Sequence, residues 1–432
     1  MTDLELIFNS LSNIIYKGKK SNDEINYLSD KASNLSYITK VIYGVLENKI
    51  YLDYMIDKLS KVKFKKIHKN VLLILEIGIY NIHFLETKDY ATVDKLVDLT
   101  KKKNKRSAGF VNAILRNFIR NEKEISKIKI GDDLKSLSVR YSMPYDITKY
   151  IFDNYGMDYT KEFLRYANKE SKLSIRVNTT KTNAESLKKD LESIGYQVNK
   201  SKISKNALIV TNPNGLVSTD LFKKGLFTIQ QEASMKTVEI LDPKHDSKIL
   251  DICAAPGTKT TYIAEYTENT GKILANDVSF NKLDLILENI NRLSLKNIEL
   301  TNFDARDFKE EYEDKFDYVL VDAPCSGLGV MARKPEIRYN RSLDDIKKLA
   351  NLQREIIINS IKYLKVGGVL VYSTCTIGNI ENIENFEFIK DMENMEVIPI
   401  DGKENIEFVC FNDETDGFFI SKFKKIWYER KY

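Results

Sequence analysis

The 432-residue sequence has few of the residues on which many enzyme mechanisms depend. It contains three histidines, His68, His83 and His245, and a single tryptophan. Only His245 lies in the C-terminal two-thirds of the chain, in a polar turn. A Ser-His-Asp or Cys-His mechanism therefore has almost no candidate for its base. A catalytic cysteine in this chain needs some other means of activation.

Cysteine is scarce as well, and its spacing is not that of a metal site. Cys253, Cys325, Cys375 and Cys410 form no C-x-x-C pair. The sequence thus indicates neither a zinc site nor a disulfide framework, and we expect no metal. Four free thiols fit a reducing compartment, so we expect a cytoplasmic protein.

Long apolar runs are also absent. No stretch of 18 apolar residues occurs, so we expect no membrane span. Residues 1–13 include Asp3 and Glu5 and lack a basic start followed by an apolar run, so we expect no secretory signal. The sequence does not indicate the oligomeric state, and our working expectation is a monomer.

The net charge of +5 is unevenly distributed along the chain. Residues 1–140 hold 26 Lys and Arg against 17 Asp and Glu, whereas residues 141–432 hold 41 against 45. A basic module usually binds nucleic acid, although charge alone leaves open a solvated lysine-rich surface. The candidate RNA-binding residues form one basic cluster: Lys101, Lys102, Lys103, Lys105 and Arg106.

Hydrophobic periodicity divides the chain into three parts. Residues 1–140 show helical spacing and predict an all-α bundle. Residues 141–240 read as a small α/β linking subdomain, with strands at 173–177 and 207–210 around a helix at 181–194.

Residues 241–432 alternate strands and helices in the rhythm of a doubly wound, Rossmann-like parallel sheet. Strands are predicted at 248–252, 272–277, 298–303, 317–322 and 368–374, and helices at 279–293 and 342–364. In such sheets the ligand lies at the carboxyl ends of the strands.

The first strand end carries a segment of small residues that leads into a helix. Its members are Cys253, Ala254, Ala255, Pro256, Gly257, Thr258 and Lys259. Small residues let the backbone approach a ligand, and the helix start offers free N–H groups. The segment is neither G-x-G-x-x-G nor a P-loop, so a dinucleotide or ATP site is disfavoured. Asp277, at the next strand end, suits ribose hydroxyls, although it is equally able to cap the following helix.

Three further strand ends carry polar groups. Asp304 follows the third strand, Asp322 and Cys325 follow the fourth, and Cys375 follows the fifth. Asp304 also fits the bland role of a turn residue before Arg306. Two cysteines at strand ends of one sheet suggest joint action on one substrate. The competing interpretation is a pair of small buried thiols, the commoner fate of free cysteine.

These motifs resemble those of the Nol1/Nop2/Sun family of RNA 5-methylcytosine methyltransferases. The resemblance rests on residues 251–260 (DICAAPGTKT), 322–325 (DAPC) and 373–375 (STC), and extends through 222–232 and 416–419. Residues 109–116 (GFVNAILR) resemble a NusB-type RNA-binding domain. The pairing implies a NusB-like bundle, a linking subdomain and a methyltransferase domain, with S-adenosylmethionine as cofactor and 16S ribosomal RNA of the small subunit as partner.

The resemblance also implies roles for individual residues. Cys375 would add to carbon 6 of cytosine, and Cys325 would serve as base or release group. Asp322 would bind the cytosine amino group and ring nitrogen, and Lys259 would hold Asp322 or the thiolate. For the cofactor, residues 253–259 would form the binding loop, Asp277 would bind the ribose, Asp304 would bind the adenine amino group, and Asp322 would also contact the cofactor.

The chain departs from the family pattern at two places. Thr258 stands where the family has a second glycine, and threonine fits only if the backbone there is not left-handed. The family's Pro-Glu-Glu-Asn is replaced by residues 379–382 (NIEN), a helix start that we expect to lie outside the core site. Three alternatives remain: a transfer-RNA methyltransferase, a non-catalytic RNA-binding factor, and a nicotinamide-dependent oxidoreductase, which shares the sheet but has a glycine fingerprint.

Overall fold

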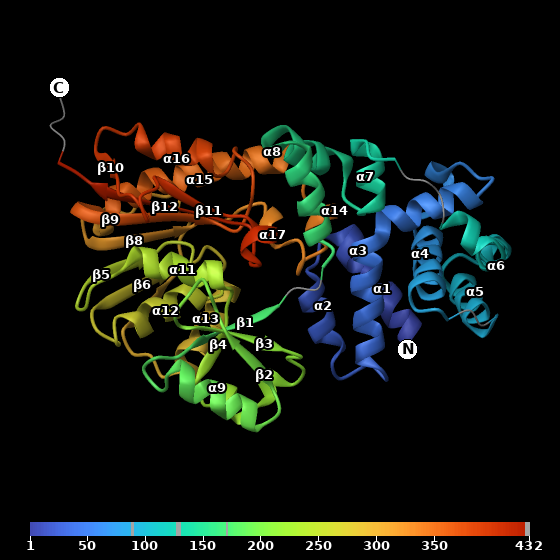
Figure 1. The fold of residues 1–432 in the computed structure, drawn as a ribbon, viewed down its shortest axis with the longest axis horizontal. Helices are drawn as coiled ribbons and strands as arrows, with labels where there is room; N and C mark the ends of the chain where they lie inside the picture. Colours follow the sequence, from blue (N-terminus) through green and yellow to red (C-terminus); the bar gives the residue numbers. More distant parts are fainter. Residues whose placement is uncertain (88–89, 127–130, 170–171, 428–432) are drawn as a thin grey trace. The chain divides into compact units, whose positions relative to one another are not determined.

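The computed structural model describes residues 1–87, 90–126, 131–169 and 172–427. The chain divides into two compact units (Figure 1). One comprises residues 1–169 and 331–343, and the other residues 170–330 and 344–432.

The first unit is helical and has its own apolar core. Helix α1 begins with a capping box, in which Thr2 accepts a hydrogen bond from the Glu5 N–H and Glu5 accepts one from the Thr2 N–H. Helix α8 is interrupted at Gly156, whose φ of 78° is not helical. The helices are α1 (Asp3–Lys17), α2 (Ser21–Leu28), α3 (Leu35–Leu59), α4 (Lys69–Phe84), α5 (Tyr90–Asn104), α6 (Ala108–Ile125), α7 (Leu134–Arg140), α8 (Tyr145–Tyr166) and α14 (Ile337–Asn340).

The segment Met331–Leu343, distant in sequence, belongs to this helical unit. Its Arg338 is fully buried and donates hydrogen bonds to the Glu47 and Ala167 carbonyls. Glu336 accepts hydrogen bonds from the Ser21 N–H and hydroxyl, the latter at 2.9 Å. These buried polar contacts secure the segment within the bundle.

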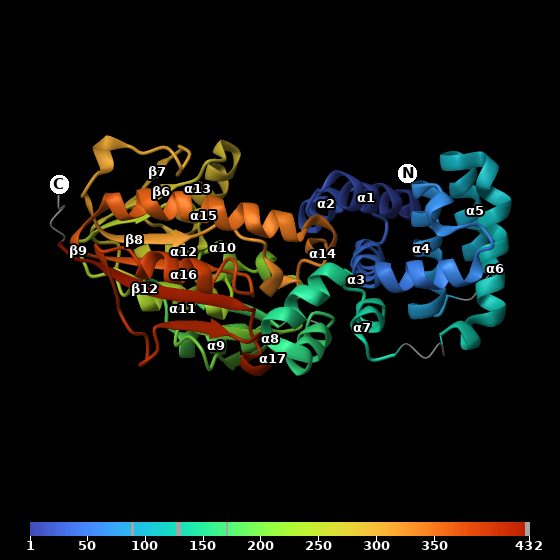
Figure 2. The same cartoon turned by 90° about the horizontal axis from the view of Figure 1, so that it is seen from above.

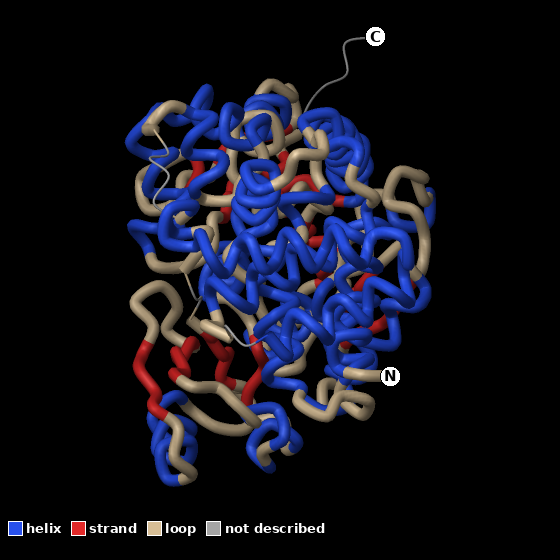
Figure 3. Tube along the Cα trace, turned by 90° about the vertical axis from the view of Figure 1, so that its right-hand side faces the viewer, coloured by secondary structure: helices blue, strands red, loops and turns tan. Residues whose placement is uncertain are grey.

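The linking subdomain contains a four-stranded antiparallel sheet in the order β2-β3-β1-β4, whose strands lie side by side in Figure 3. Asn183 caps α9 by accepting a hydrogen bond from the Ser186 N–H. The elements are β1 (Leu173–Val177), α9 (Ala184–Ser193), β2 (Gln197–Lys200), β3 (Ala207–Thr211), α10 (Asp220–Lys223) and β4 (Phe227–Ile229).

The C-terminal part of the chain is built on an eight-stranded sheet in the order β10-β12-β9-β8-β5-β6-β7, with β11 paired to β12. Strands β5 to β9 run parallel, and β12, β10 and β11 add antiparallel pairs. The strands are β5 (Lys248–Asp251), β6 (Lys272–Asn276), β7 (Ile298–Thr301), β8 (Phe316–Asp322), β9 (Leu364–Thr374), β10 (Met395–Val397), β11 (Asn405–Phe408) and β12 (Phe418–Lys425).

Helices cover both faces of this sheet (Figures 1 and 2). Neighbouring strand residues face opposite layers: Ile249 packs toward α11, α12 and α13, and Leu250 toward α15 and α16. The helices are α11 (Glu232–Leu241), α12 (Thr258–Tyr266), α13 (Phe280–Leu293), α15 (Leu343–Tyr363), α16 (Ile383–Lys390) and α17 (Cys410–Asp413).

The predicted fold class is confirmed, with one correction to the sheet. All five predicted parallel strands are present. The two helices predicted at 279–293 and 342–364 are α13 and α15, whose ends lie within one residue of the predicted bounds. The sheet is mixed rather than purely parallel, because residues 395–425 return as antiparallel strands at the β9 edge. No helix among the described residues is long and apolar enough to cross a membrane.

Candidate active site

A pocket of about 470 Å³ lies at the carboxyl ends of the parallel strands. It is lined by residues that end or follow β5, β6, β7, β8 and β9, together with two apolar residues of α15. Seven of the residues singled out in the sequence line this pocket: Cys253, Ala255, Asp277, Asp304, Asp322, Cys325 and Cys375. The sheet topology thus gathers residues up to 122 positions apart.

Two thiols face each other in the pocket wall. The Cys325 and Cys375 sulfurs are 3.3 Å apart, and both residues are half-buried. The contact with Cys375, together with burial, raises the pKa of the Cys325 thiol well above its ordinary value. Cys325 therefore keeps its proton at neutral pH and is able to donate a hydrogen bond to the Cys375 sulfur.

Asp322 is held from both sides. Its Oδ2 lies 2.7 Å from the Lys259 Nζ, and its Oδ1 accepts a hydrogen bond of 2.9 Å from the Ser373 hydroxyl. Lys259 is almost fully buried, and its ammonium lies 5.3 Å from the centre of the Phe418 ring. These two contacts fix the orientation of the Asp322 carboxylate at the pocket wall.

The loop 253–259 serves several structural purposes at once. Cys253 and Ala255 line the pocket, whereas the Ala254 N–H bonds to the Asn276 carbonyl. Gly257 has a φ of 91° and packs closely against Ile286 of α13. The left-handed position is thus a glycine, and Thr258 begins α12 in a helical conformation. A threonine at position 258 is therefore compatible with this backbone.

Asp277 and Asp304 occupy different environments. Asp277 is 7 % exposed and accepts hydrogen bonds from the Ala255 and Ser279 N–H groups, so it faces the pocket and bonds to the N-cap residue of α13 without capping the helix itself. Asp304 accepts from the backbone and guanidinium of Arg306, and these bonds lower the pKa of its carboxyl. Asp304 is thus a turn residue, as its bonds to Arg306 show, and it also lines the pocket.

Residues 379–382 precede α16 and none of them lines the pocket, but Glu381 contacts the loop that carries Cys325. Glu381 is 1 % exposed and accepts hydrogen bonds from the Ser326 N–H (2.9 Å) and hydroxyl and from the Gln353 side chain (3.0 Å). Gln353 also donates to the Pro324 carbonyl. The two side chains hold the loop that carries Cys325 on either side of the thiol.

Sequence analysis missed part of the pocket wall. Lys282 of α13 and Leu352 and Ile356 of α15 line it without belonging to any recognisable motif. Leu352 and Ile356 are spaced four apart on α15, the ordinary pattern of a core-facing helix, so nothing in the sequence marks them as pocket residues.

The basic cluster of the helical unit lies on α5 and the turn that follows. Lys101 pairs with Asp98 and Lys102 with Glu5, both at 2.8 Å, and Lys103 bonds to Asn9. A second group of exposed lysines, which we did not single out from the sequence, lies between α3 and α4: Lys61, Lys63, Lys65 and Lys66.

The described residues offer no histidine base in this pocket and no cluster of metal ligands. His245 bonds to the Thr267 carbonyl at 3.0 Å, and the residues lining the described pocket include no histidine. Within the described part of the chain, no group of three His, Cys, Asp or Glu side chains is arranged to hold a metal ion.

Comparison with known proteins gives a consistent assignment for all three parts. Family models match at residues 1–120 (NusB family), 146–216 (ferredoxin-like domain of RsmF/B-like methyltransferases) and 238–424 (16S rRNA methyltransferase RsmB/F). The chain is 36 % identical to the probable ribosomal RNA small subunit methyltransferase B of Bacillus subtilis, over 84 % of this chain and 80 % of the relative.

Solved structures agree with this result. The crystal structure of PH0851 is 25 % identical with a TM-score of 0.82 and covers 98 % of both chains. NSun6 from Pyrococcus horikoshii, solved with SFG, is 27 % identical with a TM-score of 0.59, over 66 % of this chain and 99 % of that one. The resemblance to the Nol1/Nop2/Sun methyltransferases is confirmed, and the chain belongs to the RsmB/F family of ribosomal RNA methyltransferases.

Proposed function

We propose that this methyltransferase transfers a methyl group from S-adenosylmethionine to carbon 5 of a cytosine in 16S ribosomal RNA, with Cys375 as a covalent nucleophile. The observation that carries the proposal is the pair of thiols 3.3 Å apart in a pocket that also presents Asp322. The RsmB/F match supports the choice of a small-subunit ribosomal RNA.

The pocket fits the proposed cofactor. Its volume lies in the ordinary range for small-molecule sites, and its wall combines apolar side chains with a few polar groups. Asp277 would bind the ribose hydroxyls, Asp304 the adenine amino group, and the loop 253–259 would supply backbone contacts. When bound, S-adenosylmethionine supplies the electrophilic methyl group that carbon 5 takes up.

Cys375 would overcome the weak nucleophilicity of carbon 5. Its thiolate adds to carbon 6, forming a C–S bond and moving the electron pair of the 5,6 double bond to carbon 5. A hydrogen bond donated by the Cys325 thiol would stabilise the Cys375 thiolate before this addition. The described residues that line the pocket include no histidine, so the proton of the Cys375 thiol would leave to solvent.

Cys325 would then remove the proton from carbon 5. Its raised pKa is due first to the contact with Cys375. Once Cys375 has become a neutral thioether, the Cys325 thiol would release its proton to solvent, and the resulting thiolate would be the base. Taking the carbon 5 proton restores the double bond and expels Cys375 as a thiolate.

Asp322 would select cytosine over uracil. A carboxylate accepts a hydrogen bond from the exocyclic amino group, which uracil lacks. Lys259 and Ser373 leave lone pairs on both Asp322 oxygens while fixing the carboxylate's orientation.

The RNA would be bound through phosphate contacts, with the target base flipped into the pocket. Lys101, Lys102, Lys103, Lys105 and Arg106 are the proposed phosphate-binding residues of the helical unit. The ammonium groups of Lys101 and Lys102 are exposed in their pairs with Asp98 and Glu5, so exchanging these partners for phosphates loses little, and RNA binding should weaken as salt rises.

The proposal is tested by methyl transfer from isotopically labelled S-adenosylmethionine to naked 16S ribosomal RNA, assembled small subunits and total transfer RNA. Mass spectrometry then identifies the modified base, and a Cys375→Ala variant gives the background. We expect 5-methylcytosine in ribosomal RNA. Label confined to transfer RNA would overturn the substrate, and label on another base or atom would overturn the chemistry.

A further inference from the structure

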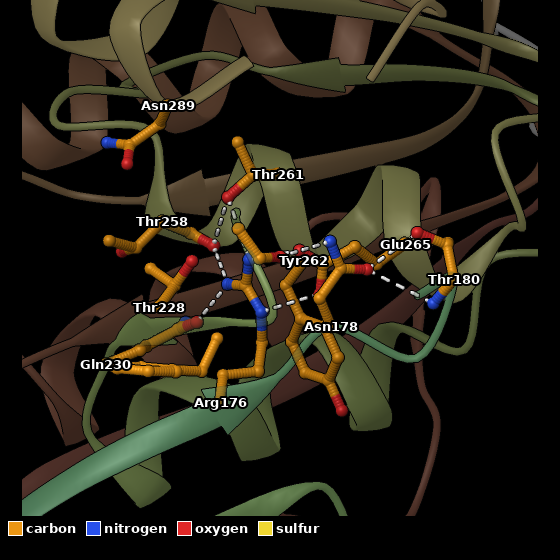
Figure 4. A network of polar contacts seen from close by, with 12 residues as sticks. Arg176, Asn178, Thr180, Thr228, Gln230, Thr258, Thr261, Tyr262, Glu265 and Asn289 are labelled. Carbon is orange, nitrogen blue, oxygen red and sulfur yellow. Dashed lines mark hydrogen bonds and ion pairs between the residues drawn. The ribbon is translucent and has the colours of Figure 1, made fainter. Parts of the chain in front are cut away.

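One arginine of the linking subdomain is completely buried against the cofactor loop of the methyltransferase domain. Arg176 lies on β1 and has no exposed surface, yet its guanidinium donates five hydrogen bonds (Figure 4). The acceptors are the Glu265 carboxylate (2.9 and 2.8 Å), the Thr261 hydroxyl (3.0 Å), the Thr258 carbonyl and the Gln230 side chain. All five donors of the group are therefore used.

These partners link the subdomain to a single helix. Thr258, Thr261 and Glu265 lie on α12, whereas Gln230 follows β4 in the linking subdomain. Tyr262 of the same helix lies beneath the guanidinium, 4.9 Å from it. Arg176 is thus hydrogen-bonded to the first two turns of α12. Because the guanidinium is planar and rigid, these bonds fix the distance of α12 from β1 and the rotation of the helix about its axis.

Stability alone does not account for this arrangement. The N-terminal end of a helix dipole is positive and disfavours a nearby cation, so the interaction of the Arg176 charge with the first turn of α12 is unfavourable. Glu265 compensates the charge, but a fully buried ion pair commonly contributes no more than apolar packing would. What the pair does provide is a defined geometry at the start of α12.

The start of α12 is also the end of the loop proposed to bind the cofactor. Thr258, whose carbonyl Arg176 holds, is separated by two residues from Ala255 in the pocket wall and is followed by Lys259, the partner of Asp322. Thr261 extends the link, because its hydroxyl donates to the Gly257 carbonyl at 2.8 Å. A shift of the first turn would therefore move Ala255 and Lys259 together.

We propose that Arg176 is a positioning residue that sets the cofactor loop 253–259 for binding S-adenosylmethionine. This inference rests on the proposed function, since it assumes that the loop binds that molecule. The linking subdomain then acts as a brace for the cofactor site in addition to any contact it makes with RNA.

The chain offers a matched control in a second arginine between the same two parts. Arg292 of α13 donates to the Phe222 and Phe227 carbonyls and to the Thr228 hydroxyl, and it stacks on Phe222 at 4.1 Å. Its remaining bond goes to Asn289 of its own helix. None of these partners lies on α12 or in the loop 253–259, and the link from Arg292 to the loop is indirect and long, through the bond of 3.4 Å that Asn289 donates to the Pro256 carbonyl.

The test measures the affinity of the full-length protein for S-adenosylmethionine by calorimetry, with Arg176→Lys and Arg292→Lys compared. Lysine keeps the charge but loses the fork. We expect Arg176→Lys to weaken binding by about tenfold or more, the effect of losing one hydrogen bond to a charged group. Arg292→Lys should stay within about twofold, and the KM for RNA should not change in Arg176→Lys.

Equal losses in the two variants, or wild-type affinity in Arg176→Lys, would overturn the inference. Wild-type protein that binds no S-adenosylmethionine would instead overturn the proposed function. If Arg176→Lys fails to fold, as judged by circular dichroism, Thr261→Val removes one of the same contacts more gently. It should weaken binding about threefold, and unchanged affinity in that variant would also overturn the inference.

Discussion

Two loops that line the pocket, one after β5 and one after the neighbouring strand β8, are secured in different ways. The loop 322–326, which carries Asp322 and Cys325, is held by Glu381 and Gln353 from the same domain. The loop 253–259 is held at its end by Arg176, which comes from the linking subdomain. The thiol chemistry is thus supported locally, whereas the proposed cofactor site depends on a second subdomain. Changes at the first loop should lower the rate of transfer, and changes at the second should weaken cofactor binding.

Loss of the nucleophile should give the largest effect. Cys375→Ala removes the group that adds to carbon 6, so we expect transfer to fall by at least about 10⁴-fold. Affinity for S-adenosylmethionine, measured by calorimetry, should remain within about twofold, because the cofactor loop is intact. Residual transfer near the wild-type rate would contradict the role of Cys375.

The second thiol should affect release rather than attack. In Cys325→Ala no thiol takes the carbon 5 proton, so we expect turnover to fall by about 10²–10³-fold. A protein–RNA adduct that survives denaturing electrophoresis should accumulate when cofactor is present. Normal turnover without an adduct would show that another group removes the proton.

A residue that holds the first loop should give a smaller loss of the same kind. Glu381→Gln replaces one carboxylate oxygen with an NH2 group, so at least one of the donors bonded to Glu381 loses its acceptor, which loosens Ser326 next to Cys325. We expect kcat to fall about tenfold while cofactor affinity is kept. Glu384→Gln is the matched control, since Glu384 is exposed and pairs with Arg354 at the surface. Equal effects in the two variants would show that Glu381 has no specific role in positioning the loop that carries Cys325.

A change on the cofactor side should invert this pattern. Asp277→Asn keeps an oxygen acceptor but replaces the charged partner of the Ala255 N–H and of the proposed ribose contact. We expect the KM for S-adenosylmethionine to rise about fivefold and kcat to change by less than about twofold. A fall in kcat at unchanged KM would contradict the claim that the loop 253–259 affects cofactor binding and the loop 322–326 affects the rate of transfer.

The residues that carry chemistry were easier to predict than those that hold them. Asp322, Cys325 and Cys375 end strong apolar strands, so period and topology place them at one edge of the sheet. Arg176 lies in an alternating strand, where a charged residue normally points to solvent. Glu381 lies at a predicted helix start. Only the tertiary partners of these two residues, which are far away in sequence, reveal that they are buried.

The fold shows the same division between local and distant information. Strands β5, β6 and β8 were predicted because each contains a short apolar run within a regular alternation of strands and helices. Strands β10 and β11 have three and four residues, too short for a period to emerge. The placement of Met331–Leu343 in the helical unit depends on buried contacts of Glu336 and Arg338, which no local pattern encodes.

The most direct test of the central claim identifies the atom that bonds to RNA. The Cys325→Ala variant is incubated with S-adenosylmethionine and 16S ribosomal RNA, the adduct is digested with nuclease and protease, and the product is sequenced by mass spectrometry. The account predicts one methylated cytidine attached to the peptide at Cys375. An adduct on any other residue, or 5-methylcytosine formed with no adduct at all, would contradict it.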